Sequence, residues 1–347
     1  MINSLTSLRG IFILFIFFHH CLNLYDGGGT MAVAFFFVLG GFAMTLGYEK
    51  RVRSHEFNYK DYIVRRCVKF YPLHWLCLLA VLPFALWSFN WKVIPVFLIN
   101  AVLLQTWIPV KVIYFSFNSV SWYLANTIFF AALFPFVFRW ILGASPKRKG
   151  IIAVFLGIFY ILVALLIPED KHHAVLYISP YMRIMDFVLG IYLAIGYLKI
   201  KEITLIKRNI TLCQVITGSL IAILVVESCL LPDDARLFAP VYWIPISALI
   251  LIVSLTEKIW GGQIILCHKY LQKLGELSFI IFMIHQIILR YTTILFEKIL
   301  HLENDIIYIV FTLAMTLIAS MIIDKYFLKP ITQWLTKRDQ RSMIAHS

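Results

Sequence analysis

The chain has 347 residues, of which 61% are hydrophobic and 14% are charged. A soluble domain carries about 25% charged residues, so this composition excludes an ordinary soluble protein and indicates a polytopic membrane protein. Lysine and arginine exceed the acidic residues by 31 to 18, which gives a formal net charge of +13. The six cysteines show no metal-ligand spacing, so we predict neither a metal site nor a disulfide framework.

A membrane-spanning helix needs about 20 apolar residues. The stretches that approach or meet this condition are 7–25, 30–48, 71–89, 121–142, 150–167, 181–198, 210–231, 241–256, 275–296 and 305–328. A further apolar stretch, 93–108, contains Pro95 and is ended by Pro109, and we expect it to be re-entrant or non-crossing. The predicted fold is therefore an all-α, polytopic membrane helix bundle of about ten transmembrane helices, formed by a single domain over 1–347.

The basic residues predict the orientation of the bundle, because loops rich in lysine and arginine stay on the cytoplasmic side. They gather in the segments 49–69, 147–149, 199–208, 258–273 and 325–341. These segments share one side only if 93–108 does not cross. Both termini are then cytoplasmic, and 328–347 is a cytoplasmic tail. We expect 57–70 to form a cytoplasmic interfacial helix that leads into the next span, the alternative being a charge cluster that binds acidic lipid head groups.

The first predicted helix carries Arg9, His19 and His20 within an apolar run. Ionisable side chains in hydrocarbon are costly and usually functional. Arg9 and His20 are eleven residues apart, which puts them on one helix face about 16 Å apart along the axis. A neutral imidazole can take a proton from a hydroxyl group and later return it. The alternatives are a packing histidine and an inside-positive arginine anchor.

Three further groups could carry chemistry. Arg65, Arg66 and Lys69 precede the third span, where arginine side chains suit phosphate oxygens. Arg183 and Asp186 are three residues apart and hence helix neighbours, in a structural or a functional ion pair. Ser278 and His285 are seven residues apart and nearly co-facial, with a channel-lining or a core role. Trp122 could stack on a sugar, although interfacial aromatic residues normally anchor helices.

Six segments, taken in order, resemble the acyltransferase 3 family of integral membrane acyltransferases, which includes bacterial O-acetyltransferases that modify surface glycans. The resemblance covers about 5–290, and its segments are SLRGIFILFIFFHH, MAVAFFFVLGGFAMTLGY, YIVRRCVKFYPLHWL, SVSWYLANTIFFAALFP, SPYMRIMDFVLGIYL and LGELSFIIFMIHQ. The fourth resembles the family pattern WSL…E…FY…FP, yet Thr127 stands where the pattern has glutamate. Lys69 and Asp186 replace the usual arginine and glutamate of two other motifs.

The resemblance implies transfer of an acyl group, by default acetyl, from cytoplasmic acyl-coenzyme A to a hydroxyl group of a carbohydrate. It makes His20 the base or the acyl carrier and Arg9 its orienting partner. Arg65, Arg66 and Lys69 would hold the coenzyme A phosphates. The expected location is the bacterial inner membrane, with lipids and a glycan acceptor as partners and no nucleic acid.

Two other functions stay open on the sequence. A transporter or exporter of small molecules or acyl groups would suit ten spans with buried charges, although no halves related by a repeat are visible. A relative that binds coenzyme A without turnover would suit the loss of the glutamate at Thr127. The sequence does not predict the oligomeric state.

Overall fold

The computed structural model describes residues 2–21, 27–54, 57–87, 90–201, 210–257, 266 and 268–334. Within these ranges the chain is helical and contains no strand. The longer helices are α1 (Asn3–His20), α2 (Gly28–Arg53), α3 (Tyr59–Trp87), α6 (Ser121–Gly143), α7 (Pro146–Leu166), α9 (Pro180–Ile200), α10 (Ile210–Leu230), α12 (Pro240–Thr256), α13 (Lys269–Ile294) and α14 (Asp305–Ile323). The shorter elements are α4 (Val93–Ala101), η1 (Gln105–Trp107), α5 (Lys111–Tyr114), α8 (Glu169–His172), η2 (His173–Ile178), α11 (Asp233–Arg236), η4 (Leu295–Leu300) and η5 (Asp324–Leu328).

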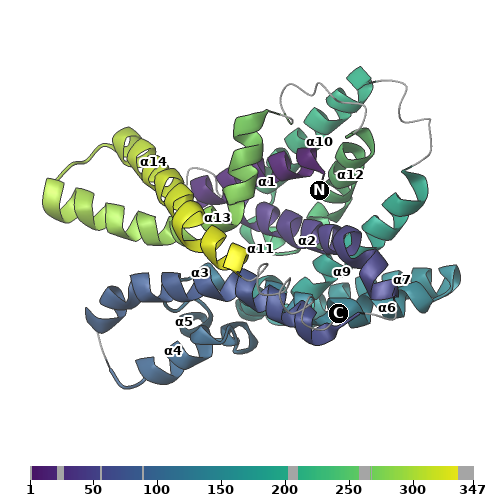
Figure 1. Ribbon diagram of the computed structural model, residues 1–347, viewed down its shortest axis with the longest axis horizontal. Helices are drawn as coiled ribbons and strands as arrows, with labels where there is room; N and C mark the ends of the chain where they lie inside the picture. The colour runs from purple at the N-terminus through teal and green to yellow at the C-terminus, as the bar shows by residue number, and fades with distance from the viewer. Residues whose placement is uncertain are drawn as a thin grey trace.

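The predicted helix bundle is confirmed (Figure 1). Among the described residues, 8 helices are long and apolar enough to cross a membrane. The 18-residue α1 and the 17-residue α12 fall just outside that group. These two helices and the 8 spanning helices correspond one to one to the ten predicted spans. The expected tail at 328–347 is described only as far as residue 334.

Two predicted boundaries are wrong. The helix expected over 7–25 begins earlier and ends at His20, where Cys21 caps it by donating its N–H to Phe17 O at 2.9 Å. The interfacial helix expected at 57–70 and the span that follows it form one continuous helix, α3, which runs through Pro72 without a boundary. A single buried stripe explains this continuity, because the same face packs on the bundle from one end of α3 to the other. Its members are Tyr62, Phe70, Leu73, Cys77 and Val81.

The segment 93–108 does not cross the bundle. Its only α-helix in the structure, the nine-residue α4, is about 14 Å long, roughly half the hydrocarbon thickness. The contacts of α6 also indicate that 93–108 does not cross. Arg139, near the end of α6, donates to Val52 O at the end of α2, and Tyr62, near the start of α3, donates to Ala131 O of α6. The end of α6 therefore lies beside the loop that connects α2 to α3.

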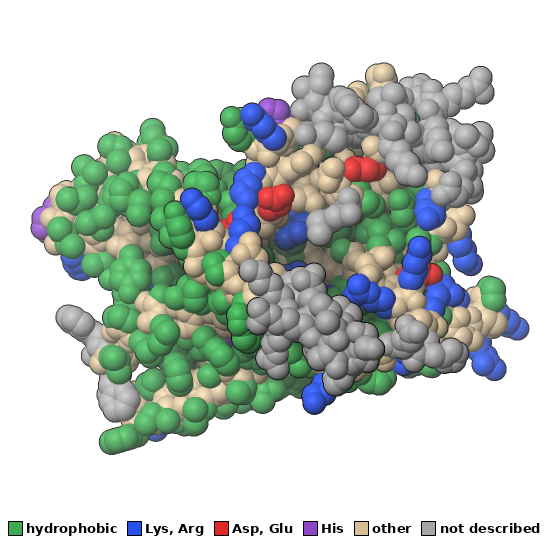
Figure 2. Space-filling view, viewed as in Figure 1, with side chains coloured by type: hydrophobic (Ala, Val, Ile, Leu, Met, Phe, Trp, Pro, Cys, Tyr) green, Lys and Arg blue, Asp and Glu red, His purple; other side chains and the backbone are tan. Residues whose placement is uncertain are grey.

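The basic segments consequently gather at one end of the bundle, as predicted. Helices α1 and α2 are antiparallel, since Phe12 stacks on Phe35 and His19 lies against Gly29. On the face drawn in Figure 2, lysine and arginine side chains gather in the middle and on the right, whereas the part formed by α4 and α14 is almost entirely apolar. The basic residues 207, 208, 258 and 335–347 lie outside the described ranges.

Two helix pairs approach each other so closely that only glycine fits between them. A Cβ on Gly275 of α13 would lie 1.7 Å from Thr6 O of α1, and one on Gly190 of α9 would lie 2.0 Å from Val38 O of α2. In membranes, small residues allow backbones to come together and dispersion forces to hold helices. The α1–α13 contact joins the first predicted span to the ninth, and this pair carries the candidate site.

Candidate active site

His20 and His285 meet across the contact between α1 and α13. His285 Nε2 lies 3.4 Å from His20 Nδ1, and the ring centroids are 5.1 Å apart. His285 is fully buried, whereas His20 keeps part of its surface exposed. His19 packs edge-on against His20 at 4.8 Å and rests on Gly29 at the start of α2. The sequence pointed to all three histidines without predicting that His20 and His285 are neighbours.

Backbone carbonyl groups fix the tautomer of both neutral imidazoles. His285 Nδ1 lies 2.8 Å from Phe282 O, and His20 Nδ1 lies 2.9 Å from Ile16 O. A carbonyl oxygen only accepts, so each Nδ1 carries the proton and each Nε2 carries the lone pair. The lone pair of His285 faces the N–H of His20. In the described part of the chain, no group bonds to His20 Nε2, which is therefore the available basic atom.

Arg9 also contacts α13, at a point nearer to the end of the bundle where the basic segments gather. Its Nη2 donates to Ser278 Oγ at 2.9 Å, and Ser278 Oγ donates to Gly275 O at 2.8 Å. Arg9 and His20 thus both face α13, which confirms the predicted shared face. Ser278 and His285 both face α1, as their spacing indicated. Arg9 is partly exposed, so its remaining N–H groups can serve a ligand.

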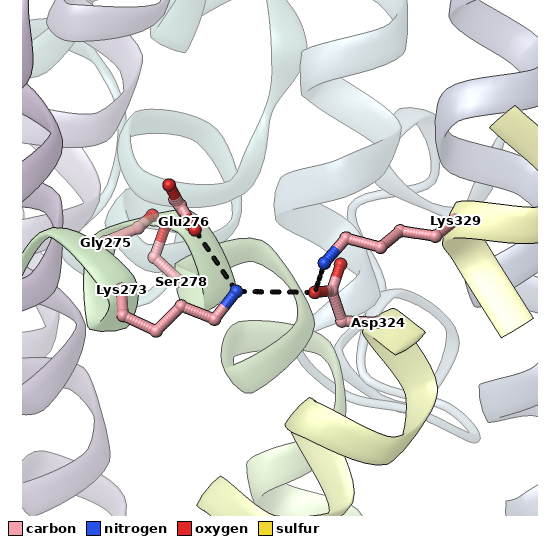
Figure 3. A network of polar contacts seen from close by, with 6 residues as sticks. All are labelled: Lys273, Gly275, Glu276, Ser278, Asp324 and Lys329. Carbon is pink, nitrogen blue, oxygen red and sulfur yellow. Dashed lines mark hydrogen bonds and ion pairs between the residues drawn. The ribbon is translucent and has the colours of Figure 1, made fainter. Parts of the chain in front are cut away.

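An ion network joins the beginning of α13 to η5, which directly follows α14 (Figure 3). Lys273 Nζ lies 3.2 Å from Glu276 Oε2 and 3.5 Å from Asp324 Oδ2, and Lys329 Nζ lies 2.8 Å from the same Asp324 oxygen. Each such exposed pair contributes at most about 1 kcal/mol. The network begins one turn before Ser278, so it steadies the part of α13 that holds Arg9.

The basic cluster of α3 lies at the same end. Arg66 is held over the Tyr48 ring at 4.6 Å, and the charges of Arg66 and Arg9 both act on Lys69. Among the described residues, no carboxylate oxygen lies within 4.0 Å of Arg9, Arg66 or Lys69. Lys69 and Arg65 are exposed. Three cations from two helices thus form a positive region in which none has an ion-pair partner within 4.0 Å among the described residues, and the charge of Glu276 acts on Arg9 from farther away.

Arg183 and Asp186 form a separate, fully buried ion pair in α9. Arg183 Nη2 lies 3.1 Å from Asp186 Oδ2, and Trp243 of α12 donates its indole N–H to the other carboxylate oxygen at 2.6 Å. The Arg183 guanidinium also lies over the rings of Phe37 and Tyr177, at 5.1 Å and 5.6 Å. The pair therefore joins α9 to α2 and α12, away from the two histidines.

Trp122 does not have the exposed position expected of a sugar-stacking residue. Only 4% of it is exposed, and its ring packs between Tyr177 at 4.9 Å and Phe37 at 6.3 Å. The cause is its place at the first turn of α6, against α2 and η2. Sequence reasoning also missed Tyr123, which follows Trp122 and whose ring lies 4.8 Å from that of Phe282 in α13, a contact that no local pattern indicates.

Comparisons with known proteins bear on this arrangement. The family model described as an acyltransferase domain (Acyl_transf_3) matches residues 2–325, nearly the whole chain. The chain belongs to the acyltransferase 3 family. A curated relative in Streptomyces mycarofaciens, named acyltransferase MdmB, is 27% identical over 297 residues, which cover 76% of this chain and 69% of the relative. No solved structure matches.

Membership of the acyltransferase 3 family confirms the resemblance and identifies a membrane acyltransferase. The matched range includes α1, α3 and α13, and so all the side chains that meet around His20 and Arg9.

Proposed function

We propose that this acyltransferase moves an acetyl group from acetyl-coenzyme A to a hydroxyl group of a carbohydrate, with His20 as the general base. The observation that carries the proposal is the orientation of His20. The His20 Nδ1–H donates to Ile16 O and also lies near His285 Nε2. The lone pair is therefore on His20 Nε2, which is available because the ring is partly exposed. An imidazole fixed in this tautomer is suited to proton transfer.

The reaction follows from this arrangement. His20 Nε2 takes the proton of the acceptor hydroxyl while the hydroxyl oxygen forms a bond to the thioester carbonyl carbon. The carbon–sulfur bond then breaks, and the coenzyme A sulfur leaves with the electron pair and takes the proton back from His20. During the step His20 is an imidazolium, and the lone pair of His285 Nε2 stabilises its Nδ1–H. An acetyl group carried on His20 Nε2 is the two-step alternative.

The positive region supports an acyl-coenzyme A donor. Coenzyme A bears phosphate groups, and among the described residues no carboxylate oxygen lies within 4.0 Å of the cations of Arg66, Lys69 and Arg9. Arginine and lysine hold phosphate oxygens by charge-assisted hydrogen bonds. Arg9 also stands about 16 Å along α1 from His20. Phosphates at this end and a thioester at the histidine pair would therefore place the donor along the α1–α13 contact, entering from the predicted cytoplasmic side.

The test is acetyl transfer by the membranes of cells that produce the protein. Labelled acetyl-coenzyme A should give base-labile label in the carbohydrate fraction, together with free coenzyme A. His20→Asn should lower both at least a hundredfold, whereas the same change at the exposed His301 should not. Equal activity of His20→Asn and wild type would remove His20 from the mechanism. Without an acceptor, a gain of one acetyl group in the mass of the intact protein would favour the two-step route.

A further inference from the structure

Tyr123 lies in the first turn of α6, between α2 and the helix α13 that carries part of the candidate site. Its ring stacks on Phe37 of α2, with centroids 4.6 Å apart, and lies 4.8 Å from the ring of Phe282 in α13. Phe282 follows Ser278 by one helical turn and precedes His285 by three residues. Tyr123 therefore stands level with the stretch of α13 between the partner of Arg9 and the partner of His20.

The hydroxyl group of Tyr123 keeps hydrogen-bonding capacity in these aromatic surroundings. The charges of Arg9 and Arg183 both reach it, and the Thr127 hydroxyl is within hydrogen-bonding reach. Thr127 donates its own proton to Tyr123 O at 2.8 Å, so its oxygen is left to accept. Tyr123 and Thr127 are both partly exposed. In the described ranges, no further group bonds to the Tyr123 hydroxyl.

Tyr123 and Thr127 are four residues apart and hence one above the other on α6. Together they supply two neutral hydroxyl groups beside the helix that carries the candidate site. A neutral pair suits an uncharged polar part of a ligand rather than a cation.

We propose that Tyr123, with Thr127 beside its hydroxyl group, binds an amide group of the pantetheine arm of the acyl-coenzyme A donor, namely the amide farther from the sulfur. This inference rests on the proposed function. With phosphates near Arg66 and Lys69 and the thioester at His20, the arm has to pass the level of Phe282. An amide that leaves water for aromatic surroundings needs new partners. The Tyr123 phenol donates to the amide carbonyl oxygen, and the adjacent Thr127 hydroxyl group keeps the phenol in this position.

The test compares Tyr123→Phe, which removes one hydroxyl group and keeps the ring, with wild type on three donors. Acetyl-coenzyme A and acetyl-pantetheine contain the distal amide, whereas the acetyl thioester of N-acetylcysteamine lacks it. The loss of one buried hydrogen bond should raise KM about tenfold for the first two donors and leave kcat unchanged. KM for the truncated donor should stay the same. Thr127→Val should act in the same direction.

Tyr192→Phe is the matched control, because it removes a phenol that donates to Lys149 O at the other side of the bundle. It should leave every KM unchanged. A loss of kcat with the truncated donor would overturn the proposal, since the phenol would then act at the reacting carbonyl. An equal KM of Tyr123→Phe and wild type for all donors would also overturn it.

Equilibrium titration with coenzyme A separates this proposal from the proposed function. If the wild type binds coenzyme A but transfers no acetyl group, the proposed function fails while the inference predicts about tenfold weaker binding by Tyr123→Phe. If both proteins bind coenzyme A equally, the inference fails whatever the activity. If the wild type shows no binding, both fail.

Discussion

The close contact between α1 and α13 predicts that Gly275→Ala misaligns the site. A Cβ at this position would lie 1.7 Å from Thr6 O, and real Cβ contacts are essentially never shorter than 3.0 Å. The obstacle is backbone, so the two helices have to move apart by about 1.3 Å. Overpacking of this kind destabilises a protein by about 1–3 kcal/mol.

The same movement separates the side chains that meet across this contact. Arg9 would leave Ser278, now 2.9 Å away, and His20 would leave His285, now 3.4 Å away. A displacement of about 1 Å at a catalytic group can cost about a hundredfold in rate. We therefore expect kcat for acetyl transfer to fall about a hundredfold in Gly275→Ala.

Two control variants distinguish misalignment from general damage. Gly190→Ala introduces a similar clash, 2.0 Å from Val38 O, but between α2 and α9. It should lower the thermal midpoint in detergent about as much as Gly275→Ala while retaining much more activity in the folded fraction. Gly157→Ala meets no atom within 4 Å and should be neutral. If Gly275→Ala transfers acetyl groups at the wild-type rate, the helices are not held at this distance and the reasoning is refuted.

Three further outcomes are expected. His285→Ala should lower kcat about tenfold at unchanged KM for acetyl-coenzyme A, and His285→Gln should restore part of it, because an amide oxygen can accept the same hydrogen bond; equal loss in both variants would contradict this. Asp186→Asn should lower the unfolding free energy by about 3–5 kcal/mol, since it leaves the Arg183 charge buried and unpaired; an unchanged unfolding midpoint would argue against a buried pair. Burial and the Lys111 charge lower the pKa of His173 from 6.5 to about 4. The contribution of neutral His173 to stability is therefore complete above pH 6.5 and is lost as the pH falls towards 4. The thermal midpoint of His173→Gln should drop less between pH 7 and pH 5 than that of the wild type, and an identical drop in both proteins would refute this expectation.

Much of the fold follows from the sequence because lipid imposes a simple rule. A span must be long, apolar and helical. The ten predicted spans therefore correspond to real helices, and charge placement alone indicated that 93–108 does not cross. Boundaries were less predictable. The end of α1 at His20 and the continuity of α3 through Pro72 depend on packing against other helices, which local composition does not contain.

In the candidate site, too, the features within one helix were predictable from the sequence and the contacts between helices were not. Helical periodicity placed Arg9 and His20 on one face because both lie on a single helix. The contact between His20 and His285 joins residues far apart in the chain, and no local pattern encodes it. Tyr123 was missed for a related reason, since only its position between α2 and α13 gives its hydroxyl group a role. Trp122 was misjudged because an aromatic residue near a helix end was assumed to face the interface.

The pairing of α1 with α13 also bears on biosynthesis. The ribosome makes α1 before α13, so the histidine pair comes into existence only after the helices between them have been inserted into the lipid. A chain that is terminated before α13 would contain His20 without its neighbour. Such fragments are expected to transfer no acyl group.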